Sequence, residues 1–104
     1  MREICIAHLD KARPVLVLTR APARAAMTKV TVAPITSTIR GLSSELRLGP
    51  GNGLDHDSVA SLDNVVTIPA NLLGHTIGFL RDDQEAALAR AIVLAYDLDV
   101  PLME

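Results

Sequence analysis

Residues 13–19 read RPVLVLT, a continuous apolar run of strand length that begins next to a proline. A strand with one wet face alternates between apolar and polar residues, so an unbroken run predicts a strand buried on both faces. Proline is tolerated at the first residue of a strand, and Arg13-Pro14 therefore indicates a strand entrance. We predict a buried strand over Val15–Thr19 with Arg13 at its mouth.

The segments around this run predict further short strands, joined by turns. Strand-like patterns cover residues 4–9, 29–36, 45–48, 57–62, 65–68 and 75–80. Pro34 is expected to interrupt the second of these segments. Polar turns or loops are predicted over 10–13, 20–26 and 37–41, the strongest turn over 49–53, and a brief helical turn over 71–74.

The C-terminal part of the sequence predicts a helix. Asp82 and Glu85 have the spacing of a capping box. Apolar residues at 88, 91, 92, 95 and 98 fall on one helical face, and Pro101 is expected to end the helix. With no repeat and no linker, the sequence predicts one domain over residues 1–104, a mainly β barrel with a C-terminal helix packed on it.

Composition limits the class of protein. Hydrophobic residues make up 49% of the 104 residues and aromatic residues only 2%, so the core must be aliphatic, with some apolar surface available for a subunit interface. The lone Cys5 excludes an internal disulfide. No apolar run approaches the ~20 residues of a membrane span, and the N-terminus lacks the layout of a signal peptide, so a cytoplasmic protein is expected.

Charge is distributed unevenly along the chain. The net charge of -2 by itself argues against a nucleic-acid binder. However, residues 1–50 hold eight Lys/Arg against three Asp/Glu, a balance of +5, whereas residues 51–104 hold two against nine, a balance of -7. This asymmetry indicates a basic face for an anionic ligand, although solvated charges alone would produce the same pattern.

Three segments together resemble the MazF/PemK (Kid) toxin family. They are RPVLVLT at 13–19, VAPITSTIRGL at 32–42 followed by SEL at 44–46, and DSV at 57–59 followed by LDNV at 62–65. The resemblance implies an SH3-like CcdB/PemK-type barrel with a C-terminal helix, mainly β in class. It also implies a homodimer, sequence-selective cleavage of single-stranded RNA, and an antitoxin whose extended segment occupies the RNA groove.

The resemblance assigns roles to individual residues. Arg13 matches the catalytic arginine and Thr36 the catalytic threonine of the family. Metal-independent cleavage uses the RNA's own 2′-hydroxyl as nucleophile and leaves a 2′,3′-cyclic phosphate and a 5′-hydroxyl. A permanently charged, planar guanidinium suits the phosphate, and a hydroxyl can donate to a non-bridging oxygen.

Other residues are candidates for RNA binding. They are Ser37 and Thr38, for their hydroxyl and N–H groups, and Lys11, Arg20 and Arg40, for phosphates. The general base stays open, because arginine is a poor base. His8, Asp10 and Lys11 are candidates to assist, although a strand-edge histidine with a local partner is the simpler reading of His8.

The sequence indicates no metal and no cofactor, because Cys5 and the histidines lack metal-ligand spacing and no phosphate-loop pattern occurs. Two departures from the family are a short connection over residues 10–12 and Val66 in place of an arginine. One alternative is a CcdB-type gyrase poison, disfavoured because the chain has no Trp and does not end in Trp-Gly-Ile. The other is a barrel that binds without catalysis.

Overall fold

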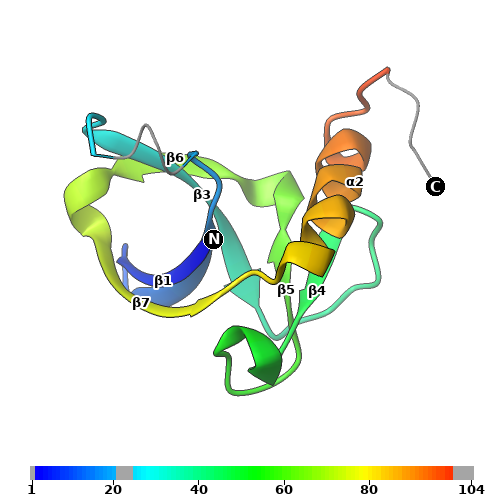
Figure 1. Ribbon diagram of the computed structural model, residues 1–104, viewed down its shortest axis with the longest axis horizontal. Coiled ribbons are helices and arrows are strands. Elements are labelled where there is room, and N and C mark those ends of the chain that lie inside the picture. Colours follow the sequence, from blue (N-terminus) through cyan, green and yellow to red (C-terminus); the bar gives the residue numbers. More distant parts are fainter. Residues whose placement is uncertain (1, 21–24, 100–104) are drawn as a thin grey trace.

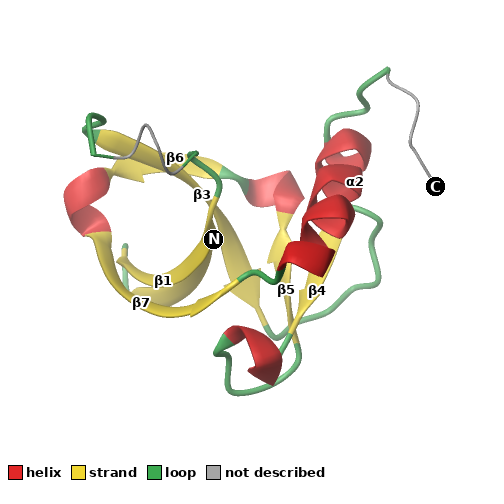
Figure 2. Ribbon diagram, viewed as in Figure 1, coloured by secondary structure: helices red, strands yellow, loops and turns green. Residues whose placement is uncertain are grey.

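The computed structural model describes residues 2–20 and 25–99 and contains seven strands and a C-terminal helix in this part of the chain (Figure 1). The strands are β1 (Glu3–His8), β2 (Ala12–Val17), β3 (Lys29–Thr36), β4 (Glu45–Leu48), β5 (Ser58–Ser61), β6 (Val66–Pro69) and β7 (Leu73–Phe79). The helix is α2 (Glu85–Ala95). Short 3-10 turns are η1 (Pro50–Asn52), η2 (Leu62–Asn64), η3 (Ala70–Leu72) and η4 (Asp82–Gln84). This mainly β architecture with a C-terminal helix confirms the expected fold class (Figure 2).

All strand pairings are antiparallel, and the sheet order is β4-β5-β3-β2-β1-β7, with β6 also paired to β3. β3 is the central strand of this arrangement, because it pairs with β2, β5 and β6. Along one edge it pairs first with β6, over Lys29–Val32, and then with β5, over Ile35 and Thr36. Pro34 falls where β3 changes partner, so its missing N–H removes no ladder bond there, and the expected interruption at Pro34 was wrong.

Two apolar cores lie on the two faces of the curved sheet. One fills the barrel and includes Val15, Val17 and Val32. The other lies between the sheet, the β4–β5 hairpin and α2, and includes Leu16. Because successive residues of β2 point into different cores, Val15–Val17 are buried on both faces of the strand, as predicted, although β2 ends at Val17 rather than at Thr19.

Several predicted boundaries are displaced. β2 begins at Ala12, so Arg13 lies inside the strand, and the turn between the first two strands is only residues 9–11. The predicted helical turn near 71–74 is η3, and β7 begins two residues before the predicted start of the last strand. The loop expected over 20–26 lies partly outside the described residues.

The helix also differs from its prediction. The carboxamide of Gln84, not Glu85, accepts the capping bond, from the backbone N–H of Arg81 at 2.9 Å. The helix ends at Ala95, because Asp97 adopts a left-handed φ of 52° and Leu98 N–H donates to the Val93 carbonyl. The Leu98 side chain therefore leaves the helix face and is 49% exposed. Pro101, the expected helix end, lies outside the described residues.

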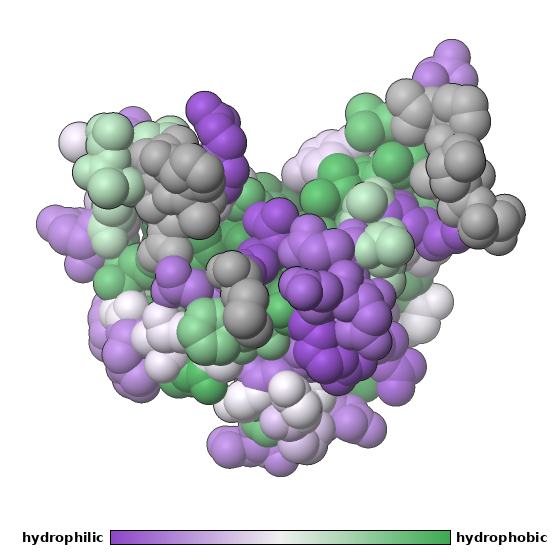
Figure 3. Space-filling model, in the orientation of Figure 1, coloured by the Kyte–Doolittle hydropathy of each residue, from purple (hydrophilic) through white to green (hydrophobic). Residues whose placement is uncertain are grey.

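Some apolar surface stays exposed near α2. Leu94, Tyr96 and Leu98 are each more than 40% exposed. Green, hydrophobic surface reaches the exterior over the helix in Figure 3. None of the helices in the described part of the chain combines the length and apolarity needed to cross a membrane.

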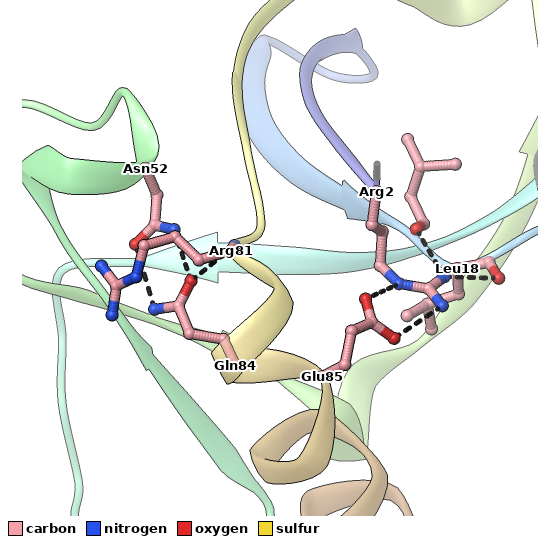
Figure 4. Close-up of polar contacts among 7 residues, drawn as sticks. Arg2, Leu18, Asn52, Arg81, Gln84 and Glu85 are labelled. Carbon is pink, nitrogen blue, oxygen red and sulfur yellow. Dashed lines mark hydrogen bonds and ion pairs between the residues drawn. The ribbon is translucent and has the colours of Figure 1, made fainter.

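Two polar clusters attach the helix region to the barrel (Figure 4). The Arg2 guanidinium donates to the carboxylate of Glu85 and to the carbonyls of Val17 and Leu18. The buried Asn52 donates to the Phe79 carbonyl at 3.0 Å and to the Gln84 carboxamide at 2.7 Å. These bonds tie the η1 turn, the end of β7 and the start of α2 into one unit.

Candidate active site

A cleft of about 760 Å³ opens where β1, β2, β3 and β7 meet the loop between η1 and β5. Most of its apolar lining residues are buried or half-buried, and its polar lining residues are mostly exposed. The apolar lining residues are Ile6, Ala12, Pro14, Ile35, Gly53, Leu54 and Ile77. The polar lining residues are His8, Lys11, Arg13, Thr36, Ser37, Asp55, His56, Ser58 and His75.

Arg13 and Thr36 lie together in this cleft, on neighbouring strands. β2 and β3 pair with Val15 opposite Pro34. If this register is continued by two residues, Arg13 stands opposite Thr36 on the same face of the sheet, where neighbouring strands are ~5 Å apart. Both residues assigned to catalysis line the cleft from neighbouring strands.

The Arg13 guanidinium is held on one side by Asp10. Its Nε and Nη2 donate to the two Asp10 carboxylate oxygens at 3.3 and 3.5 Å. The hydrogen bond from the Arg13 side chain, with a further bond from the Lys11 backbone N–H, lowers the pKa of Asp10. Because both side chains are largely exposed, this pair orients Arg13 more than it stabilises the fold. The remaining guanidinium N–H groups are left for a phosphate.

The Thr36 hydroxyl is oriented by the loop that follows it. Its Oγ1 accepts a hydrogen bond from the Thr38 backbone N–H at 3.1 Å, a turn typical of Ser and Thr at strand ends. Since the oxygen already accepts this bond, the O–H is available to donate outward. Thr36 is exposed at the end of β3, where such a donor can reach a phosphate oxygen.

The other predicted RNA-binding residues divide into two groups. Lys11 and Ser37 line the cleft with Arg13 and Thr36, whereas Arg20, Thr38 and Arg40 do not. Arg20 follows the opposite end of β2 from Arg13. Arg40 lies in a loop whose backbone N–H groups donate to the Glu45 carboxylate.

Sequence reasoning missed the contribution of the loop between η1 and β5. Gly53 has a φ of 88°, and an added Cβ there would lie 2.1 Å from the Ile77 carbonyl oxygen. An added Cβ on Gly78 would lie 1.7 Å from the Asn52 carbonyl oxygen. These two glycines let the loop pack directly on β7, which brings Asp55 and His56 to the cleft. The glycine-rich turn at 49–53 was the signal for this contact.

The arrangement suits anion chemistry. Lys11 and Arg13 provide basic side chains, Thr36 and Ser37 provide hydroxyl donors, and the apolar wall lowers the local dielectric. Within residues 2–20 and 25–99, no three His, Cys, Asp or Glu side chains are grouped so as to hold a metal ion. The guanidinium and the hydroxyls are groups in this cleft that can stabilise charge on a bound phosphate.

The fold has counterparts in known proteins. Residues 3–96 match the family model described as PemK-like, MazF-like toxin of type II toxin–antitoxin system. The chain belongs to this family, which confirms the resemblance found in three segments of its sequence and the CcdB/PemK type of its barrel.

Relatives share nearly the whole chain. Endoribonuclease MazF3 of Mycobacterium tuberculosis is 58% identical over 99 residues, which cover 95% of this chain and 96% of the relative. The structure of Mycobacterium tuberculosis toxin MazF-mt6 superposes with a TM-score of 0.93 at 56% identity, covering 95% of this chain and all of that one. A mycobacterial endoribonuclease in complex with its cognate antitoxin shares the fold, with a TM-score of 0.84 at 22% identity, over 95% of each chain.

Proposed function

We propose that the chain is a single-domain endoribonuclease toxin that cuts single-stranded RNA at selected sequences without a metal ion. The observation that carries this proposal is the position of Arg13 and Thr36 on neighbouring strands that line one cleft. The curated relative at 58% identity, named an endoribonuclease, supports the same activity.

The proposed mechanism is an internal transesterification. The 2′-hydroxyl of one nucleotide attacks the adjacent phosphorus, and the P–O5′ bond breaks to leave a 2′,3′-cyclic phosphate and a 5′-hydroxyl. Negative charge grows on the non-bridging oxygens as the pentavalent phosphorane forms. The Arg13 guanidinium, oriented by Asp10, and the Thr36 hydroxyl, oriented by the Thr38 N–H, stabilise this charge.

Substrate binding follows from the same surface. Lys11 and Ser37 extend the donor set along the cleft, and each phosphate contact adds affinity without reading sequence. The short turn at residues 9–11 leaves the cleft open to a flexible strand. Unpaired bases can reach the apolar wall formed by Ile6, Ile35 and Ile77, where a rigid duplex cannot insert its bases.

The activity is tested by incubating pure protein with total RNA in EDTA and mapping the new 5′-hydroxyl ends. The proposal predicts cleavage at a small set of related sequences, with cyclic phosphate on the upstream fragments. No cleavage in EDTA, with cleavage restored by a divalent ion, would contradict the metal-independent mechanism. Gyrase-dependent DNA breaks with intact RNA would support the gyrase-poison alternative instead.

We also propose that the toxin acts in the cytoplasm as a homodimer and is held inactive by a small antitoxin. Family membership supports the antitoxin, and exposed apolar side chains such as Leu42, Val66 and Leu94 support burial in a subunit interface. Light scattering on the purified toxin should give the mass of two chains. Co-expression with the protein encoded beside the toxin gene should restore growth, and a toxin that purifies as a monomer would contradict the dimer.

A further inference from the structure

Asp55 is an acidic side chain in a cleft whose other lining residues include the basic Lys11 and Arg13. It is exposed, and within residues 2–20 and 25–99 no hydrogen bond or ion pair engages its carboxylate. Asp10 differs in this respect, because its carboxylate accepts hydrogen bonds from the Arg13 guanidinium. An unpaired carboxylate opposes the binding of a phosphate, so Asp55 needs a different partner in a bound RNA strand.

The backbone that carries Asp55 is held on both sides. Before it, Gly53 packs directly on the backbone of β7, and Leu54 is buried in the core between the sheet and α2. After it, the Ser58 hydroxyl donates to the His56 carbonyl at 3.0 Å, where the loop enters β5. Asp55 is therefore presented to the cleft by an anchored segment of the loop between η1 and β5.

The basic and acidic side chains of the cleft come from different elements. Lys11 lies in the turn after β1 and Arg13 lies on β2, whereas Asp55 closely follows Gly53, which packs on β7. In the sheet, β1 separates β7 from β2, so the loop begins away from the strand that carries Arg13. A strand of RNA in the cleft thus meets basic groups from β2 and its turn, and a carboxylate from the loop.

RNA offers an ionised carboxylate a limited choice of partners, because a carboxylate only accepts hydrogen bonds. Cytosine, adenine and guanine carry an exocyclic amino group that donates, and the ribose 2′-hydroxyl donates as well. Uracil has no amino group, and the carbonyl oxygens beside its single N–H repel a carboxylate. The apolar Leu54 and Ile77 line the same cleft and give the face of a base a surface to pack on, which favours a base over a ribose as the partner.

We propose that Asp55 recognises one base of the RNA and selects a base with an exocyclic amino group against uracil, an inference that rests on the proposed ribonuclease function. The amino group donates to the Asp55 carboxylate while the face of the base packs on the apolar lining of the cleft. Lys11 and Arg13 bind the phosphates, which carry no sequence information. Asp55 therefore supplies sequence selection that the basic side chains do not.

The test is cleavage of an RNA library randomised around one mapped site, with the products sequenced. At one position, the wild-type protein should cut RNA with the favoured amino-bearing base about 5–100-fold faster than RNA with uracil. Asp55→Ala should remove this preference. Asp55→Asn should accept uracil as well, because a carboxamide can donate to the uracil carbonyl. Asp99→Asn changes an exposed carboxylate that follows α2 and does not line the cleft, and this control should keep the wild-type preference.

A base analogue tests the contact itself. Replacing cytosine by 2-pyrimidinone, adenine by purine or guanine by hypoxanthine removes the amino group and leaves the rest of the base in place. The wild-type protein should cut the analogue more slowly than the parent, by about the factor that Asp55→Ala loses on the parent. Asp55→Ala should cut parent and analogue at the same rate, because either change alone already removes the contact.

The outcomes separate this inference from the function beneath it. If the wild-type protein cuts no RNA, the proposed function fails. If it cuts and Asp55→Ala keeps the wild-type base preference at every position, the assignment to Asp55 is wrong. If Asp55→Ala slows cleavage equally for all bases, the carboxylate contacts the ribose or supports the loop, and base recognition by Asp55 is overturned. The urea midpoints of the Asp55 variants should match the wild type, because this exposed side chain has no partner in the described part of the chain.

Discussion

Asn52 offers a quantitative test of how the cleft wall is held. Its side chain is 2% exposed, yet it makes hydrogen bonds to three other residues. It donates to the Phe79 carbonyl at 3.0 Å and the Gln84 carboxamide at 2.7 Å. It accepts from the Gly49 backbone N–H at 3.1 Å and, more weakly, from the Gln84 carboxamide at 3.4 Å.

Asn52→Ala removes these bonds and leaves buried polar partners without a replacement. At about 0.5–1.5 kcal/mol for each of the three shorter bonds, the free energy of unfolding should fall by about 2–4 kcal/mol. For a chain of this size, that corresponds to a decrease in melting temperature of roughly 10–30 °C. The loss is a large share of the stability of a typical domain, about 5–15 kcal/mol.

The assay is urea unfolding followed by circular dichroism, with wild type and variants at one protein concentration because subunit association contributes to stability. Asn71→Ala is the matched control, since Asn71 is exposed on η3 and should change stability by less than about 0.5 kcal/mol. If Asn52→Ala unfolds at the same urea concentration as Asn71→Ala, the network around Asn52 does not hold the loop.

Three further predictions concern the contact between β7 and the loop after η1, the attachment of α2 by Arg2, and the orientation of Arg13 by Asp10. Gly78→Ala should lower the free energy of unfolding by about 1–3 kcal/mol and slow RNA cleavage, because its Cβ would collide with the Asn52 backbone carbonyl. Gly51→Ala is the control, because its Cβ would meet only the flexible Arg81 side chain, and it should change neither quantity in the same assays. Arg2→Met should lower the free energy of urea unfolding by about 1–2 kcal/mol, because two backbone carbonyls and the first residue of α2 lose their donor, and an unchanged midpoint would contradict this. Asp10→Ala should lower the cleavage rate several-fold by releasing Arg13 from its orientation. Because the pKa of Asp10 is lowered, wild-type Asp10 keeps its charge, and its hydrogen bonds to Arg13, at every pH above its ordinary pKa. The ratio of variant to wild-type cleavage rates should therefore stay constant between pH 6 and 8. A ratio that changes over this range would contradict the orienting role of Asp10.

Periodicity predicted the strands well where local pattern and burial coincide. The run at 13–19 reads as buried because β2 separates two cores, and this burial is visible in the sequence itself. The pattern at 29–36 gave a strand, but Pro34 was misjudged because its tolerance depends on β3 changing partner there. A change of partner belongs to the tertiary structure and leaves no local signal.

The start of the helix also depends on tertiary contacts that the local sequence pattern does not contain. Asp82 and Glu85 have capping-box spacing, but Glu85 instead bonds Arg2, 83 residues earlier in the chain. Gln84 takes the capping role because its carboxamide also bonds Asn52. Long-range partners thus outweighed the local capping preference predicted for Glu85.

The candidate site was only partly predictable. Arg13 and Thr36 were assigned through a family resemblance, and both line the cleft. His56 and His75 carried no signal, because their approach to the cleft depends on sheet order and on the packing of two glycines. Arg20 and Arg40 were chosen by charge alone, which does not specify the end of the sheet at which a residue lies.

The central claim is that Arg13 and Thr36 act on the same phosphate, and a double-mutant cycle tests it most directly. Single-turnover cleavage of one oligonucleotide in EDTA would be measured for wild type, Arg13→Ala, Thr36→Ala and the double variant. Groups that stabilise one transition state act together, so the double variant should be little slower than the slower single variant. If the two losses multiply in full, or if either single variant cuts at the wild-type rate, the two side chains do not share a scissile phosphate.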